Sequence, residues 1–412
     1  MLKIMKVLEK KYLVPFILIT SLFFLWGLAN NMTDTLLAAF KRIMSMSDTQ
    51  TSFIQMAFYG AYFCVAFPAA LFIRKRSYKA GVILGLCLYA LGAMLFLPAA
   101  KVASYGFYLV AIYVLACGCS VLETTANPYI LSMGDPETAT RRLNVAQAFN
   151  PLGSITGILL SQAFILSDIS LYSVSGTYFG LGCVLVMLMV VMLCVKMPEG
   201  KDDTSDMNQN SWRSSIRRLV SNKKYLFGVV AQFFYVGAQI GVWSFTIRIV
   251  MNELGILEKP AATIYLISII GFCLSRFVYT WLMKYFKPSK LLIFGSLLSL
   301  VCTLLVVFTA GTQWFMVIAL ILVSMFMSLM FPTIYGIALG DVEKESCGGC
   351  AGDAKIGASG LIMAILGGAI LTPIQGLVSD AVGINWSYLV PAFCFAVVLM
   401  YALYVTRIEN AN

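Results

Sequence analysis

Apolar runs of about 20 residues recur along the chain, and each has the length of an α-helix that crosses the hydrocarbon core of a bilayer. Lipid offers no partner for backbone N–H and C=O groups, so a spanning segment must be a helix or a strand of a closed barrel. These runs are too long and too continuous for barrel strands. With 60% hydrophobic and only 12% charged residues, the sequence predicts an all-α, polytopic membrane protein.

Polar breaks divide the apolar runs into twelve predicted transmembrane helices. Their approximate ranges are 15–40, 50–73, 80–99, 105–134, 141–167, 174–196, 223–251, 260–283, 289–310, 313–340, 354–380 and 385–406. The first run follows four lysines as a secretory signal would, but its pattern continues past Asn31 without a convincing cleavage site, so we expect it to be retained.

The most hydrophilic stretch lies between predicted helices six and seven. It predicts an N-terminal half at residues 1–197, a cytoplasmic linker at 198–222 with a short amphipathic helix near 212–220, and a C-terminal half at 223–412. A weak repeat relates the halves, because Leu152-Gly153 of helix five matches Leu366-Gly367 of helix eleven. Two parallel six-helix repeats with a site between them are the organisation of the major facilitator fold.

Small residues four positions apart predict places where two helices approach closely. The pairs are Gly81/Gly85, Gly153/Gly157, Gly176/Gly180, Gly237/Gly241 and Gly336/Gly340.

Basic residues gather on one predicted side of the membrane. Of the 29 Lys and Arg residues, 23 fall at the two ends of the chain, in the linker or in loops on that side, and four fall on the other side. Basic loops stay in the cytoplasm, so we expect both termini there and the protein in the inner membrane. This placement explains the net charge of +10 without a nucleic-acid partner.

Two acidic residues, Asp34 and Glu123, lie well inside predicted spans. A charge at a helix centre costs at least about 2.5–3.5 kcal/mol, so such acids usually serve ions, protons or substrates. The chain has no histidine, the usual group that titrates near neutral pH, and burial favours the neutral form of a carboxyl group. We therefore predict both acids as proton carriers. Permanent pairing with Arg248 or Arg276 is the alternative.

Amide and aromatic side chains accompany the acids. Flat rings pack against the apolar face of a sugar, and amides bind its hydroxyl groups, so the set predicts a site for a neutral polyol. Hydrogen bonding between helices is the structural alternative for each amide. The candidate substrate contacts are Trp26, Asn31, Glu123, Asn127, Gln147, Asn150, Tyr235, Gln239 and Trp243.

Five segments together resemble the L-fucose:proton symporter branch of the major facilitator superfamily, and the resemblance covers nearly the whole chain. They are residues 23–34, 77–81, 122–128, 142–150 and 235–239. The resemblance implies proton-coupled uptake of a neutral monosaccharide, most readily L-fucose, by alternating access. It further implies a proton site at Asp34, a residue that meets both sugar and proton at Glu123, and sugar contacts at Asn31, Gln147 and Asn150.

Two features differ from the fucose branch. Met330-Phe331-Pro332 stands where that branch has glutamine and tyrosine before the proline, and the loop at about 168–175 is shorter. Glucose/galactose-type relatives tend to have glutamine at the helix-four acid, so Glu123 favours fucose. A glucose/galactose or N-acetylhexosamine symporter stays open as an alternative.

Other function classes fit less well. A membrane-embedded enzyme would need a nucleophile, base or metal cluster, and without histidine or a HExxH, GxSxG or P-loop motif we predict no catalytic residues, metal or cofactor. Cys347 and Cys350 have metal-type spacing but no second pair. A drug-efflux antiporter would favour a more apolar cavity. We expect a protein that functions as a monomer, with a monosaccharide, a proton and the lipid bilayer as its partners.

Overall fold

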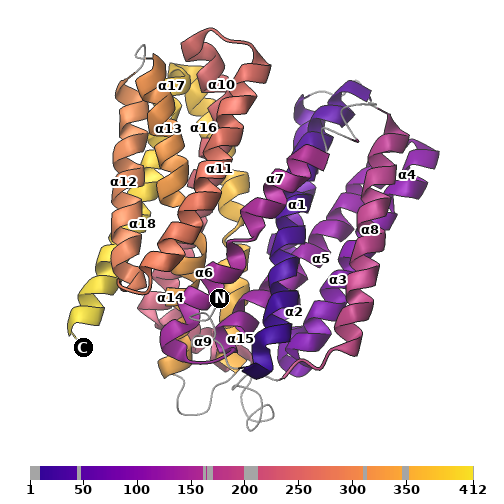
Figure 1. Cartoon of the computed structure of the whole chain (residues 1–412), viewed down its shortest axis with the longest axis vertical. Coiled ribbons are helices and arrows are strands. Elements are labelled where there is room, and N and C mark those ends of the chain that lie inside the picture. The colour runs from indigo at the N-terminus through magenta and orange to yellow at the C-terminus, as the bar shows by residue number, and fades with distance from the viewer. Residues whose placement is uncertain are drawn as a thin grey trace.

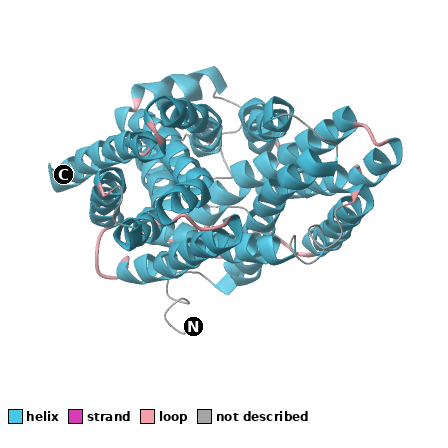
Figure 2. Ribbon diagram, turned by 90° about the horizontal axis from the view of Figure 1, so that it is seen from above, coloured by secondary structure: helices cyan, strands magenta, loops and turns pink. Residues whose placement is uncertain are grey.

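The computed structural model describes residues 10–43, 48–160, 164, 170–198, 212–309, 313–345 and 352–411. All regular elements in these ranges are helices (Figure 2). Ten helical segments of the described chain are long and apolar enough to cross a membrane. The first helix and an interrupted fifth helix occupy the two remaining predicted positions.

Helices of the first half form one bundle, and those of the second half form another (Figure 1). The first bundle contains α1 (Leu13–Ile43), α2 (Asp48–Lys75), α3 (Tyr78–Met94), α4 (Phe96–Val102), α5 (Tyr105–Ser132), α6 (Ala139–Gln147), α7 (Asn150–Leu160) and α8 (Leu171–Cys194). The second contains α10 (Lys223–Leu254), α11 (Glu258–Leu282), α12 (Pro288–Phe308), α13 (Gln313–Met327), α14 (Met330–Glu345), α15 (Gly352–Met363), α16 (Leu366–Val382), α17 (Ile384–Ser387) and α18 (Leu389–Ala411). The predicted linker helix is α9 (Trp212–Ser221). The residue boundaries of the two halves stay a prediction.

Several spans that we predicted as continuous helices are interrupted, so those predictions were wrong in this respect. Four interruptions are followed by a proline at the second or third position of the next helix: Pro98, Pro151, Pro332 and Pro391. Proline lacks a backbone N–H and tolerates the first helical turn, so a new helix starts there readily. The break between α15 and α16 has no such proline, and a turn of the backbone separates the two helices.

The packing of the first bundle repeats in the second. α7 packs on α1 as α16 packs on α10, and α5 packs on α2 and α3 as α13 packs on α11 and α12. A Cβ added to Gly153 would lie 1.8 Å from the Phe24 carbonyl oxygen, and one added to Gly367 would lie 1.9 Å from the Phe233 carbonyl oxygen. The matched glycines therefore bring equivalent backbones into contact, which confirms the repeat.

Some of the predicted small-residue pairs lie where two described helices approach closely, and others do not. At Gly81/Gly85, Gly153/Gly157 and Gly237/Gly241, an added Cβ would lie 1.8–2.7 Å from atoms of another helix. Gly336 is equally close to Thr140, whereas no described atom lies within 4 Å of a Cβ on Gly340. The prediction was wrong for Gly176 and Gly180, which are exposed on α8 with no described atom within 4 Å.

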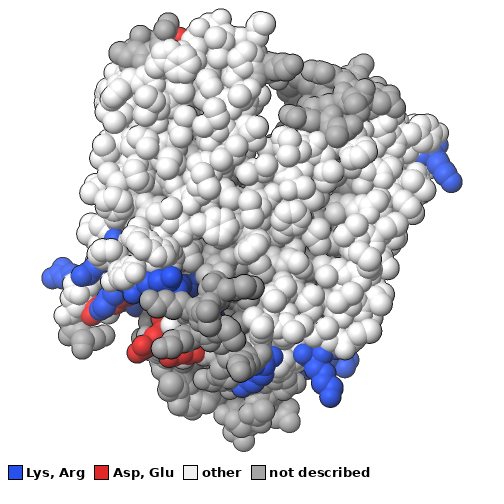
Figure 3. Space-filling model, in the orientation of Figure 1, with Lys and Arg blue, Asp and Glu red and all other residues white. Residues whose placement is uncertain are grey.

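The two bundles meet at the end of the molecule that carries α9. There α15 packs on α2 and α5, and α14 packs on α6 (Figure 1). Arg218 of α9 donates to both carboxylate oxygens of Asp353 at 2.7 Å, and Arg74 of α2 donates to Ser215 of α9 at 3.3 Å. The linker helix is therefore bonded to both bundles. Described Lys and Arg residues gather at this end of the face in Figure 3, in agreement with the charge asymmetry of the sequence.

The contact between α3 and α5 gives a test of the fold. A Cβ on Gly118 would lie 2.2 Å from the backbone nitrogen of Tyr89, so Gly118→Ala forces the two helices apart. We expect a loss of about 1–3 kcal/mol from overpacking and a melting temperature lowered by several degrees in detergent. Gly180→Ala is the matched control and should melt like the wild type. Equal melting temperatures for the two variants would contradict this packing.

Candidate functional site

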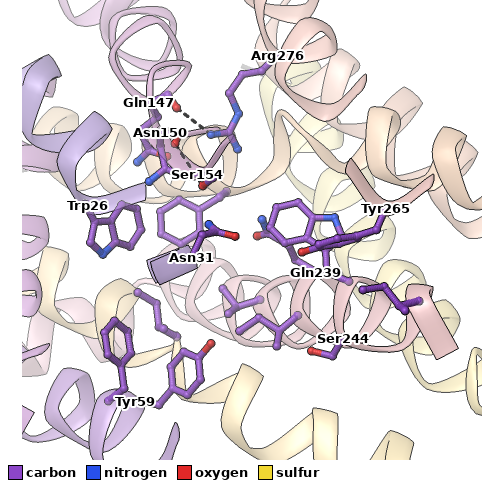
Figure 4. Close-up of a pocket in the computed structure, with 17 residues that line it drawn as sticks. Trp26, Asn31, Tyr59, Gln147, Asn150, Ser154, Gln239, Ser244, Tyr265 and Arg276 are labelled. Atoms are coloured by element: carbon purple, nitrogen blue, oxygen red, sulfur yellow. Dashed lines mark hydrogen bonds between the residues drawn. The ribbon is translucent and has the colours of Figure 1, made fainter. Parts of the chain in front are cut away.

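A cavity of about 400 Å³ lies between the two bundles (Figure 4). Its size falls within the range of small-molecule sites, which is roughly 300–1,000 Å³. The first half contributes side chains of α1, α2, α6 and α7, and the second contributes α10, α11, α14 and the α15–α16 junction. The lining residues are Trp26, Asn31, Phe58, Tyr59, Gln147, Asn150, Ser154, Val236, Gln239, Ile240, Trp243, Ser244, Ile247, Tyr265, Arg276, Phe331 and Ile365.

Most of the predicted contact residues meet at this cavity. Six of them line it: Trp26, Asn31, Gln147, Asn150, Gln239 and Trp243. Figure 4 shows Asn31 and Gln239 extending into the same space from opposite halves. The amides and rings of both halves are therefore within reach of one small molecule.

Three predicted contacts are buried away from the cavity wall. Tyr235 is fully buried, and its hydroxyl donates to the Met327 carbonyl at 3.1 Å. Asn127 is also fully buried and accepts from the Gln147 side chain at 2.8 Å. Glu123, 3% exposed, lies on the same helix, where Asn127 donates to its backbone carbonyl at 3.1 Å. In this conformation these residues lie behind the lining.

Of the two predicted proton carriers, the structure describes the side chain of Glu123. Neither carboxylate oxygen of Glu123 has a hydrogen-bond partner among the described residues. Arg276 bonds elsewhere and Arg248 is exposed, so permanent pairing with either arginine is not found for Glu123. Asp34 belongs to α1, but its side chain lies outside the described residues, as do Cys347 and Cys350.

Helix α7 is pressed against α1 beside the cavity. A Cβ on Gly27 would lie 2.1 Å from the Asn150 carbonyl oxygen. The Asn150 amide donates to the Phe23 carbonyl at 3.2 Å, and the Ser154 hydroxyl reaches the Gly27 carbonyl at 3.4 Å. These bonds fix the first turn of α7, which presents Asn150 and Ser154 to the cavity.

Arg276 on α11 is the one charged residue among the described lining residues. Its guanidinium lies beside two backbone carbonyls that prolines leave without an N–H partner. In a continuous helix the carbonyls of Gln147 and Ser328 would accept from residues 151 and 332, but both of those are prolines without an N–H. Arg276 donates to the Gln147 carbonyl at 2.9 Å and to the Ser328 carbonyl at 2.7 Å. One guanidinium thus satisfies a carbonyl from each half.

Five polar lining residues were not among the sequence candidates: Tyr59, Ser154, Ser244, Tyr265 and Arg276. The tyrosines carried no signal, because aromatic residues make up 13% of the chain. Pro151 and Pro332 do indicate a need for a donor such as Arg276, because each leaves the carbonyl four residues earlier without its helical N–H partner.

A comparison with protein families settles the family. The model of the Major Facilitator Superfamily matches residues 19–349. This chain belongs to the Major Facilitator Superfamily. A crystal structure of a transporter of this superfamily, FucP, in the outward conformation superposes on it with a TM-score of 0.86 at 36% identity, covering 96% of this chain and 99% of that one. The proton:xylose symporter XylE, at 11% identity, shares the fold with a TM-score of 0.71.

Curated relatives match the chain along nearly its full length. It is 42% identical to the L-fucose-proton symporter of Haemophilus influenzae over 98% of this chain and 99% of that protein. It is 37% identical to the L-fucose-proton symporter of Escherichia coli over 96% and 93%. It is 33% identical to the glucose/galactose transporter of Brucella abortus over 96% and 95%.

The role of Arg276 can be tested by removing its guanidinium. Arg276→Met leaves two buried carbonyls unpaired, at about 1–3 kcal/mol each, so we expect a melting temperature lowered by several degrees in detergent. Arg248→Met, at an exposed arginine of α10, is the control and should change little.

A second substitution separates this bond from general packing. Pro151→Ala returns an N–H to residue 151, which can then pair with the Gln147 carbonyl. The loss caused by Arg276→Met should therefore be smaller in the Pro151→Ala background. An equal loss in both backgrounds would show that the carbonyl contact is not what Arg276 provides.

Proposed function

We propose that this protein takes up a neutral monosaccharide, most readily L-fucose, together with protons. The observation that carries the proposal is the cavity between the halves, lined by amides and aromatic rings, whose one described charged residue is already bonded to backbone carbonyls. A charged substrate would need a counter-charge there, whereas a sugar needs hydrogen bonds and flat apolar surfaces. The names of the fucose-proton relatives support the same substrate class.

The lining suits a small polyol in detail. Asn31, Gln147, Asn150 and Gln239 offer amide donors and acceptors from both halves, while Trp26, Trp243 and Tyr265 offer ring faces. A sugar held by both halves at once would favour their rocking together around it, as alternating access requires. Phe331 lines the cavity without a hydroxyl group, so this wall contributes only apolar contact.

We assign the proton to Asp34 and Glu123. Asp34 follows Asn31, a lining residue, by three positions on α1, and Glu123 is buried on α5 without a hydrogen-bond partner among the described residues. An ionised carboxylate in that state is costly, so Glu123 would carry its proton until water or another donor reaches it. In this scheme Asp34 takes the proton, and Glu123 links the proton to sugar binding.

We further propose that the protein lies in the inner membrane with both termini in the cytoplasm and works as a monomer, with halves at residues 1–197 and 223–412 joined by the linker 198–222. The excess of basic residues on one side supports this orientation. The binding of α9 to both bundles supports a linker that stays on that side.

Uptake into proteoliposomes with an imposed pH gradient tests the proposal. We expect radiolabelled L-fucose to accumulate when the outside is acidic, with weaker competition by galactose, glucose and N-acetylglucosamine. Asp34→Asn should reduce accumulation to the background level because the amide cannot carry a proton. Asp380→Asn, at an exposed acid near the end of α16, is the control. Uphill, pH-dependent uptake by Asp34→Asn would overturn the assignment, and no uptake of any of the four sugars by the wild type would overturn the function.

Glu123→Gln tests the link between sugar and proton. The amide keeps the shape of the side chain but cannot titrate, so fucose affinity should be weaker and should become the same at pH 5 and pH 8. Equilibrium binding measured across that range provides the readout. Glu253→Gln, at an acid that accepts from Asn385 near the end of α10, should retain the pH dependence of the wild type. Wild-type affinity and pH dependence in Glu123→Gln would argue against the role of this residue.

A further inference from the structure

The cavity between the bundles is long in the direction of the helix axes. Val236 and Ile247 both line it and lie eleven positions apart on α10, and Arg276 and Tyr265 lie eleven positions apart on α11. A helix rises about 1.5 Å per residue, so each pair spans about 16 Å. The two helices are joined by residues 255–257 and pack on each other, so both pairs measure the same depth. This depth exceeds the length of one pyranose ring with its hydroxyl groups.

A contact between two aromatic rings marks the middle of this depth. The rings of Trp243 on α10 and Phe272 on α11 meet edge to face, with centroids 5.0 Å apart. The Arg276 guanidinium lies over the Phe272 ring, 4.7 Å from its centroid. α10 begins next to α9, so Ile247, one turn beyond Trp243, lies farther from the end where the bundles meet. Tyr265, two turns from Phe272 in the direction away from Arg276, lies toward that outer end as well.

The outer part of the cavity is more open than the inner part. Ser244, Ile247 and Tyr265 line this outer part, which we call the outer level. Ser244 is exposed, and Ile247 and Tyr265 are partly exposed. In the inner part, Gln147 and Phe331 are only 2% and 7% exposed. Because the bundles meet at the α9 end, a small molecule that enters from the other end meets the outer level before it reaches the inner part.

The side chains of the outer level have the chemistry to bind a second sugar ring. The flat face of Tyr265 can pack on the apolar face of a pyranose, and the hydroxyl groups of Tyr265 and Ser244 can donate to and accept from sugar hydroxyls. None of the three side chains carries a charge, so a neutral ring fits there better than a phosphate or carboxylate group. Figure 4 shows Tyr265 across the cavity from Trp26, so aromatic faces are available at two separate places.

We propose that the outer level is a second sugar subsite, which holds a pyranose ring linked to the sugar in the inner part; this inference rests on the proposed function. L-Fucose joins other sugars through its anomeric carbon, so the ligand class is an L-fucosyl disaccharide. Its fucose ring lies among the amides of the inner part, and its second ring lies against Tyr265. Binding makes and breaks no covalent bond.

Competition against radiolabelled L-fucose, measured as equilibrium binding to the protein in detergent, tests the subsite. The two competitors are methyl α-L-fucoside and an α-L-fucosyl-galactose disaccharide. Both are substituted at the anomeric carbon, so their difference isolates the second ring. We expect the disaccharide to bind about two- to tenfold more tightly than the methyl fucoside, as expected for one ring packed on an aromatic face. Equal or weaker binding of the disaccharide would overturn the proposal.

Substitutions at the outer level locate the second ring. Tyr265→Ala should lower the affinity for the disaccharide more than the affinity for L-fucose, so that the preference over methyl fucoside disappears. Tyr265→Phe keeps the aromatic face and should keep most of the preference. Ser244→Trp places a bulky side chain in the outer level and should exclude the disaccharide while L-fucose still binds. Tyr285→Ala, at an exposed tyrosine beyond the end of α11, is the control and should behave like the wild type.

The outcomes separate this inference from the proposed function. If Tyr265→Ala weakens L-fucose and the disaccharide by the same factor, Tyr265 belongs to the monosaccharide site and the second subsite is overturned. If the wild type binds L-fucose but shows no preference for the disaccharide, the inference fails and the proposed function stands. If the wild type binds none of the three sugars, the proposed function fails and the inference fails with it.

Discussion

The requirement that every backbone carbonyl find a partner away from water governs this structure. Continuous helices meet that requirement by themselves, but Pro151 and Pro332 each remove one N–H and so release the carbonyls of Gln147 and Ser328. These two carbonyls come from opposite halves, and Arg276 donates to both. A buried guanidinium that would otherwise suggest an anionic substrate is thus accounted for by the backbone. The neutral character of the proposed substrate depends on that pairing.

Close helix contacts place the polar side chains around the cavity. Gly27 and Gly153 allow α1 and α7 to touch through their backbones, and Asn150 then reaches a carbonyl of α1 while it faces the cavity. Gly367 gives α16 the same relation to α10 in the second half. A larger residue at any of these positions would move a cavity wall, so the glycines determine the geometry of the site as well as the packing of the bundles.

The fold could be predicted from sequence because long apolar runs in lipid allow few structures, and the repeat followed from matched glycines. The site could be predicted in part. Amides such as Asn31 and Gln239 are conspicuous in apolar helices, and both line the cavity. Asn127 and Tyr235 are instead buried behind the lining, because the rotation of a helix about its axis decides which side chains face the cavity, and the residue type does not specify that rotation. Tyr59 and Tyr265 could not be distinguished from many other aromatic residues. Proline positions indicate four of the helix interruptions, whereas the apolar runs alone predict continuous helices.

A polar route connects the cavity with the region of Glu123. It passes from the Gln147 side chain through Asn127 to the backbone carbonyl of Glu123. A sugar that binds Gln147 would therefore touch the environment of the acid without contacting the carboxylate itself. Separate but linked sites suit a symporter, because a neutral sugar and one proton together move a single charge, worth about 2.3 kcal/mol per 100 mV of membrane potential. That energy drives accumulation only if the proton is held while the sugar is bound, and a shared contact through Gln147 is a physical means of making each depend on the other.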